Sequence, residues 1–200
     1  MLKEIEAKFL KIDHEHIKNM LSSMGAKCSH PLRLMRRTTF DYPDRRLNKN
    51  QSWIRLREEL DGKVELMLKS VKAQELGQTF EQPVIVNDYQ SAKDFLLAIG
   101  LEIKSEQESR REVWLKDDVE IMFDQWPWVP PFIEIEAKTE TEVQDLAEAL
   151  GLKWSEARFG SITPVYVDEF KISAEEFEAL EIPIKFELPV PDSLSKHKEK

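Results

Sequence analysis

The pentapeptide Glu-Ile-Glu-Ala-Lys occurs twice in this chain of 200 residues, at 4–8 and at 134–138. In both copies charged residues alternate with apolar ones, which is the period-two pattern of a β-strand with one polar face. By average residue usage, an exact pentapeptide repeat arises by chance in about one per cent of chains of this length. Nothing else recurs between the copies, so we interpret them as two strands that meet the same chemical requirement.

The same alternation recurs elsewhere, again with charged residues on one face. The residues that share a face are Arg55 with Arg57, Met67 with Lys69, and Glu120 with Met122 and Asp124. Each face alone is typical of the solvated side of a sheet. If the sheet closes with these faces inward, the apolar alternates face outward against helices. The lumen then holds carboxylates beside Arg and Lys, and it must be hydrated or hold a ligand because unpaired buried charge is costly.

Turn signals place helices between the strands. Asp13 is a suitable N-cap for a helix that Gly25 ends, and Asp61-Gly62 predicts a hairpin turn. Asn87 or Asp88 caps a second helix, and further helices are expected over 139–150 and 173–180. We predict one α+β domain over residues 1–188, with an eight-strand antiparallel sheet or barrel, and a flexible tail over 189–200.

Composition excludes several functions. The 29 Lys and Arg residues against 38 Asp and Glu residues give a net charge of −9, which argues against nucleic-acid and membrane-surface partners. The single cysteine, Cys28, excludes an internal disulfide and fits a reducing cytoplasm. No apolar run approaches the ~20 residues of a membrane span, and the first residues show no signal peptide. We therefore expect a soluble cytoplasmic protein.

The charged faces suggest a specific chemistry. Carboxylates on adjacent strands repel one another unless a cation lies between them, and an all-oxygen ligand set suits Mg²⁺ or Mn²⁺. Arg and Lys on neighbouring strands suit polyanionic oxygens, phosphate above all. The residue types alone therefore predict a divalent cation beside a ligand with anionic oxygens, phosphate above all.

The order of these residues resembles the CYTH superfamily, the triphosphate tunnel metalloenzymes, over roughly residues 2–170. The residues that carry the resemblance are Glu4, Glu6, Lys8, Arg36, Asp41, Arg55, Arg57, Lys69, Glu81, Arg111, Asp124, Glu134 and Glu136. The resemblance implies a closed eight-strand antiparallel barrel with flanking helices. Its lumen would bind a triphosphate together with Mg²⁺ or Mn²⁺.

The resemblance also implies a role for each residue. Phosphate oxygens would be bound by Lys8, Arg36, Arg55, Arg57, Lys69 and Arg111. The metal or the attacking water would be bound by Glu4, Glu6, Asp124, Glu134 and Glu136. The candidate catalytic residues among these are Lys8, Arg111 and Glu136. Trp53 is a candidate for stacking on an organic part of the substrate, or else an ordinary aromatic at the barrel rim.

Further candidates are Glu81, Glu120, Arg110 and Lys138. Since alternate residues of a strand point to opposite faces, only one of Arg110 and Arg111 can face the lumen. Arg37 competes with Arg36 for the same reason. The chain departs from the family pattern at Thr79, where many members have Glu, and over 159–166, which lacks the family's frequent basic residue.

The activity that the resemblance implies is metal-dependent hydrolysis of a triphosphate, with release of phosphate. The substrate would be tripolyphosphate, thiamine triphosphate or a nucleoside triphosphate. One alternative is a class IV adenylyl cyclase, which makes cyclic AMP and pyrophosphate from ATP. Another is a non-catalytic module that binds polyphosphate or nucleotide. In each case the expected partner is a small-molecule triphosphate, and the protein is expected to be a monomer or a homodimer.

Overall fold

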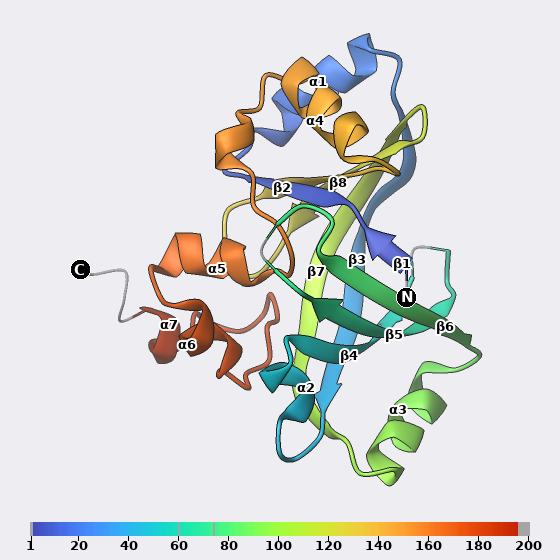
Figure 1. Ribbon diagram of the computed structural model, residues 1–200, viewed down its shortest axis with the longest axis vertical. Coiled ribbons are helices and arrows are strands. Elements are labelled where there is room, and N and C mark those ends of the chain that lie inside the picture. Colours follow the sequence, from blue (N-terminus) through green and yellow to red (C-terminus); the bar gives the residue numbers. More distant parts are fainter. Residues whose placement is uncertain (1, 60, 74, 196–200) are drawn as a thin grey trace.

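The computed structural model describes residues 2–59, 61–73 and 75–195, and within them nine antiparallel strands form one sheet (Figure 1). The strands are β1 (Leu2–Glu4), β2 (Glu6–Leu10), β3 (Lys27–Asp41), β4 (Ser52–Glu58), β5 (Val64–Val71), β6 (Thr79–Val86), β7 (Glu102–Lys116), β8 (Val119–Gln125) and β9 (Phe132–Glu136). Their order in the sheet is β1-β6-β5-β4-β3-β7-β8-β9-β2. The predicted α+β class, with an antiparallel barrel and flanking helices, is confirmed.

The barrel is nearly closed by its first segment. β1 pairs with β6, and β2 pairs with β9, so the two short strands lie at the two ends of the sheet order. Only Ile5 separates them. The predicted strand count of eight therefore becomes nine, because the chain bends at Ile5 and the expected single N-terminal strand divides between two partners.

Seven α-helices flank the sheet in the described part of the chain. They are α1 (His14–Ser23), α2 (Arg46–Lys49), α3 (Tyr89–Ala98), α4 (Glu140–Ala149), α5 (Thr163–Phe170), α6 (Ala174–Glu178) and α7 (Asp192–Ser195), with a 3-10 turn at Trp154–Glu156. The Asp13 carboxylate accepts hydrogen bonds from the first turn of α1, and Asp88 is the N-cap of α3. Thr139 and Glu142 form a capping box on α4.

The apolar faces of the strands point outward against the helices, as expected. Phe9, Ile121 and Ile133 are buried in one apolar cluster with Leu21 of α1 and Val143 of α4. Helices α1 and α4 lie together above β2 and β8 in Figure 1. A second cluster lies on the other side of the barrel, under α3. Because helices cover the apolar face of the sheet, its charged face is left for the lumen.

The last three helices form a third apolar cluster beside the barrel. Tyr166 of α5 stacks on Phe177 of α6, with ring centroids 4.5 Å apart. Leu194 of α7 is fully buried in the same cluster. Packed structure thus extends to Ser195, beyond the predicted domain end at 188, while residues 196–200 of the predicted tail lie outside the described residues. No helix in the described part is long and apolar enough to cross a membrane.

Candidate active site

A cavity of about 290 Å³ lies inside the barrel and collects most of the predicted site residues. Those on its lining are Glu4, Glu6, Lys8, Trp53, Arg55, Arg57, Lys69, Glu81, Arg111, Glu134 and Glu136. Asp124 is fully buried just behind the lining, where it binds Arg111. The sequence pattern therefore identifies the strands that surround the cavity.

Strand register explains why these residues meet. In β2 and β9, Glu6 lies opposite Glu136 and Lys8 lies opposite Glu134. Directly opposite residues of an antiparallel pair share a face. The same relation places Lys69 of β5 beside Trp53 of β4 and Glu81 of β6. Because alternate residues of a strand point to the same face, the residues two and four positions before or after each of these in its strand also face inward.

Arg36 faces away from the cavity, which corrects its predicted role. Its side chain is 71% exposed and lies 3.4 Å from Glu108 on the outside of the barrel. Arg37 is only 7% exposed and lines the cavity instead. One residue of register decides between them, and the sequence of two consecutive arginines does not reveal which one faces inward.

Three further candidates also lie off the cavity lining. Arg110 is on the outer face of β7, where its guanidinium stacks on Phe186, whereas Arg111 faces inward. Lys138 follows the end of β9, is exposed, and binds Asp118 at 2.6 Å. Glu120 lies opposite Glu136 in the register but is exposed, because it is near the end of its strand pair.

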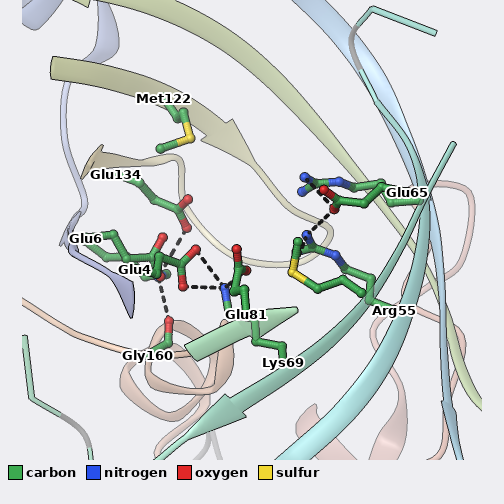
Figure 2. A network of polar contacts seen from close by, with 12 residues as sticks. Glu4, Glu6, Arg55, Glu65, Lys69, Glu81, Met122, Glu134 and Gly160 are labelled. Carbon is green, nitrogen blue, oxygen red and sulfur yellow. Dashed lines mark hydrogen bonds and ion pairs between the residues drawn. The ribbon is translucent and has the colours of Figure 1, made fainter. Parts of the chain in front are cut away.

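An acidic group occupies one part of the cavity. One carboxylate oxygen from each of Glu4, Glu6 and Glu136 lies within 4.8 Å of the others. Figure 2 shows Glu4 and Glu6 turned toward each other near Lys69. The buried Oε2 of Glu4 lies 2.6 Å from Nζ of Lys69 but receives no well-directed hydrogen bond. Lys69 also donates to Oε1 of Glu4, and Lys8 pairs with Glu6, so Glu136 is the carboxylate of the group that forms no ion pair within the described residues.

The pKa values of Glu136 and Glu6 are both raised, which agrees with the crowding of the carboxylates. Burial, and then repulsion from Glu4 and Glu6, raises the pKa of Glu136 to about 8. Burial and Glu4 also raise the pKa of Glu6. Three converging carboxylates without His or Cys fit a hard cation such as Mg²⁺ or Mn²⁺.

The other two predicted metal ligands, Asp124 and Glu134, are paired with basic side chains as well. Arg111 contacts Asp124 Oδ2 at 2.5 Å and Glu134 Oε2 at 2.6 Å. Lys8 lies 3.4 Å from Glu134, is bonded to Glu6, and donates to the carbonyl of Gly160 at 2.7 Å. Although burial opposes it, Lys8 and Arg111 lower the pKa of Glu134 to about 2. Glu134 is therefore an ionised carboxylate that orients the basic side chains of Lys8 and Arg111.

A basic group of four arginines, Arg37, Arg55, Arg57 and Arg111, occupies another part of the cavity. Arg55 and Glu65 lie across the open space from the acidic group in Figure 2, 3.1 Å apart. Arg37 differs from its neighbours because it forms no ion pair within the described residues. It donates to Ser109 Oγ at 2.5 Å and lies over the ring of Trp126, while its Nε has no partner. Burial, followed by the charges of Arg57 and Arg55, lowers its pKa. A buried guanidinium in this state fits an anion that is brought by a ligand.

Several lining residues were not identified from the sequence. Glu65 shares its face with Met67 and Lys69, so extending the alternation by one step would have found it. Lys104 of β7 and Glu178 of α6 carry no such signal. They reach the cavity through a strand irregularity and through the packing of the C-terminal helices, which only the tertiary structure defines.

The inward charge of this barrel, with arginines beside converging carboxylates, is characteristic of proteins that bind a polyanion and a cation together. The sequence profile of the CYTH domain matches residues 2–159, so the chain belongs to the CYTH family. No curated protein matches the sequence.

Solved structures share the fold. A candidate adenylate cyclase from Vibrio parahaemolyticus is 18% identical with a TM-score of 0.71, over 82% of this chain and 97% of that one. The PH1012 protein from Pyrococcus horikoshii is 22% identical with a TM-score of 0.65, over 77% and 93%. A candidate adenylyl cyclase from Hippeastrum, described as having a dominant triphosphatase activity, is 14% identical with a TM-score of 0.56, over 79% and 91%.

Proposed function

We propose that this protein is a triphosphatase that depends on Mg²⁺ or Mn²⁺ and releases phosphate from a small-molecule triphosphate. The observation that carries the proposal is the pairing, in one cavity, of the unneutralised Arg37 with the crowded carboxylates Glu4, Glu6 and Glu136. Arg37 and Glu136 form no ion pair within the described residues, and a metal–triphosphate complex would supply the opposite charge to each. The dominant triphosphatase activity described for the Hippeastrum neighbour agrees with this proposal.

In the proposed mechanism, the arginines bind the phosphate chain through charge-assisted hydrogen bonds. Arg111 would be held in place by Asp124 and Glu134, so its guanidinium needs little reorganisation when phosphate oxygens arrive. Glu4, Glu6 and Glu136 would bind the cation, which offsets the negative charge that develops on the phosphoryl oxygens. The carboxylate of Glu136 would also orient the attacking water and accept its proton.

A class IV adenylyl cyclase is the second candidate. The same cavity would bind the triphosphate of ATP, but the nucleophile would be the ribose 3′-oxygen and pyrophosphate would leave. The candidate cyclase of Vibrio parahaemolyticus, with its TM-score of 0.71, is the observation that favours this alternative. We also propose that the protein is cytoplasmic, which the single free cysteine, Cys28, supports. We propose that it is a monomer or a homodimer.

One incubation series tests the proposal. Tripolyphosphate, thiamine triphosphate and ATP are each incubated with Mg²⁺ or Mn²⁺, and orthophosphate, pyrophosphate and cyclic AMP are measured. We expect orthophosphate without cyclic AMP, and we expect the Glu6→Gln variant to lose most of that turnover while it retains its fold by circular dichroism. Cyclic AMP with equal pyrophosphate would replace hydrolysis by the cyclase reaction. Absence of all three products would favour the non-catalytic binding module.

A further inference from the structure

Glu65 of β5 is a carboxylate of the cavity lining that lies apart from the acidic group of converging carboxylates. Figure 2 shows it across the open space from that group, beside Arg55. Its Oε1 lies 3.1 Å from a terminal nitrogen of Arg55 and 3.8 Å from a terminal nitrogen of Arg57. The protein's own carboxylate thus occupies nitrogens through which these arginines would bind a phosphate.

The neighbouring Glu59 contacts its arginine in a different way. Its Oε1 accepts from Nε of Arg57 at 2.6 Å, and Glu59 is not among the described residues of the cavity lining. This contact uses neither terminal nitrogen of the guanidinium fork. Glu65 instead accepts from a terminal nitrogen of Arg55, whose Nε has no hydrogen-bond partner. Glu59 therefore positions an arginine, whereas Glu65 covers the end of the guanidinium that a bidentate contact with phosphate needs.

The pKa values of the two glutamates differ in the same sense. Although burial opposes it, Arg57 lowers the pKa of Glu59. Burial, and then repulsion from Glu59, raises the pKa of Glu65 in spite of Arg55. The arginines therefore stabilise the charge of Glu59, but they offset the cost of burying the charge of Glu65 only in part. The contact between Glu65 and Arg55 is accordingly the easier of the two to replace.

Glu65 also lies where its carboxylate can be hydrated when it leaves the arginines. It is the second residue of β5, near the hairpin between β4 and β5, and its cross-strand neighbour Ile85 is 58% exposed. Asp124 differs in this respect, because it is fully buried and contacts Arg111 through both of its oxygens. Separating Asp124 from its arginine would leave a buried charge without a partner, which is costly.

We propose that Glu65 is an internal competitor of the phosphate chain for Arg55 and Arg57. The inference rests on the proposed function, in which the arginines bind the triphosphate. In the ligand-free protein the carboxylate pairs with Arg55, and it leaves when phosphate oxygens bind there. Because only the fraction of molecules with free arginines can bind, the apparent Kd is higher than the intrinsic one. The same competition favours release of the product orthophosphate, which offers fewer oxygens than a triphosphate to replace the carboxylate.

The test is the Kd of tripolyphosphate with Mg²⁺, measured by calorimetry on the full-length wild type and on Glu65→Gln. Glutamine keeps the size of the side chain but removes the charge that pairs with Arg55, so we expect the Kd to fall about tenfold. Orthophosphate should also inhibit hydrolysis more strongly in this variant than in the wild type. Glu65→Thr, with a short β-branched side chain that suits a strand, should show the same gain in affinity. Circular dichroism shows whether each variant folds, and Glu65→Thr decides the question if Glu65→Gln does not.

Two neighbouring glutamates provide the controls. Glu59→Gln removes the same charge, but Glu59 positions Arg57 through Nε, so its loss should leave the Kd unchanged or raise it. Glu58→Gln removes a charge from an exposed residue that is off the described lining, and it should change the Kd less than twofold.

Two results would overturn the inference. One is unchanged or weaker binding in the folded Glu65 variants, which would make Glu65 a carboxylate that positions its arginine, as Asp124 does. The other is an equal gain in Glu59→Gln or Glu58→Gln, which would attribute the effect to net charge. If tripolyphosphate binds but is not hydrolysed, the proposed function fails while the Kd comparison still decides the inference. If neither the wild type nor Glu65→Gln binds tripolyphosphate, both fail.

Discussion

Individual charges in the lumen differ in how well the protein itself neutralises them. Lys8 is surrounded by Glu6, Glu134 and the carbonyl of Gly160, so it is satisfied without a ligand. Arg37 donates to the hydroxyl of Ser109 and lies over the ring of Trp126, and it forms no ion pair with a carboxylate of the described residues. Lys8 therefore stabilises the structure of the site, whereas Arg37 is free to form an ion pair with a bound anion.

Replacing Arg37 should therefore separate binding from stability. In Arg37→Met a buried, repelled guanidinium is exchanged for an apolar side chain of similar length, which is neutral or stabilising in comparable cases. We expect the Tm of the ligand-free protein to equal or exceed that of the wild type. The Kd for tripolyphosphate with Mg²⁺ should rise about 30-fold or more, since a charged hydrogen-bonding partner is lost. Thermal melts and calorimetry measure the two effects.

The neighbouring arginine provides the control for this experiment. Arg36 is exposed on the outer face and forms one loose contact with Glu108, so Arg36→Ala should change neither Tm nor Kd appreciably. A large loss of binding in Arg36→Ala would contradict the observed register of β3.

Glu136 should make the stability of the metal-free protein depend on pH. Its pKa is about 8 in the folded protein against an ordinary value of 4.5, because of burial and the nearby Glu4 and Glu6. Between these values the folded protein binds more protons than the unfolded chain, so the free energy of unfolding falls as pH rises from 5 to 8. Burial lowers the pKa of His14, which acts in the opposite direction near pH 6.5. In EDTA, Glu136→Gln should lose less Tm between pH 5 and pH 8 than the wild type, and identical slopes would contradict the assignment.

At the scale of secondary-structure elements, α1, α3 and α4 stabilise the fold from outside the barrel and contribute no side chain to the cavity lining. Helix α4 presents Val143, Leu146 and Ala147 to the outer face of the strands. Its N-terminus is fixed by the reciprocal hydrogen bonds of Thr139 and Glu142. This separation of roles predicts that damage to α4 changes stability alone.

Thr139→Ala tests that prediction. Loss of the N-cap hydroxyl leaves a helix N–H without its acceptor, so the free energy of unfolding should fall by about 1 kcal/mol. Since Thr139 is not on the cavity lining, kcat and KM below the transition temperature should stay at wild-type values. Urea unfolding and steady-state kinetics provide the two readouts. A drop in kcat with unchanged stability would show that α4 takes part in the site.

At the scale of the whole molecule, the charges inside the ligand-free barrel neutralise one another only in part. Four arginines line one part of the lumen, and three carboxylates converge in another. Most of these residues have a partner of opposite charge, but Arg37 and Glu136 form no ion pair within the described residues. Binding of a cation and an anion together would supply the partner that each lacks.

Tripolyphosphate with Mg²⁺ should therefore raise the Tm of the wild type. A ligand present at 100 times its Kd contributes about 2.7 kcal/mol to the free energy of unfolding when only the folded state binds it. The shift should be larger with both components than with either alone, because the bound cation and the bound anion attract each other. Differential scanning fluorimetry with each component, with both, and with orthophosphate measures this dependence. The absence of a shift with both would contradict the assignment of the lumen as a triphosphate site.

The sequence by itself determined the strands and the chemistry of their inner face. Period-two alternation at 4–8, 55–57 and 134–138 placed the charged residues on one side of each strand, and the pattern survives because side-chain direction in a strand is a local property. Composition likewise indicated oxygen ligands and phosphate-binding cations, since these follow from residue type.

Only the tertiary structure decided which of two adjacent residues faces the lumen and what completes the cavity. Arg37 rather than Arg36 is inside, because the register of β3 with β4 and β7 depends on pairing between distant segments. Ile5 divides the first strand because the barrel must close between β6 and β9. Glu178 and Lys104 meet only through the packing of α6 against a bulged strand. Contacts between residues far apart in the chain produce no periodic pattern in the sequence. Neither the strand register nor the cavity wall can therefore be derived from local sequence patterns.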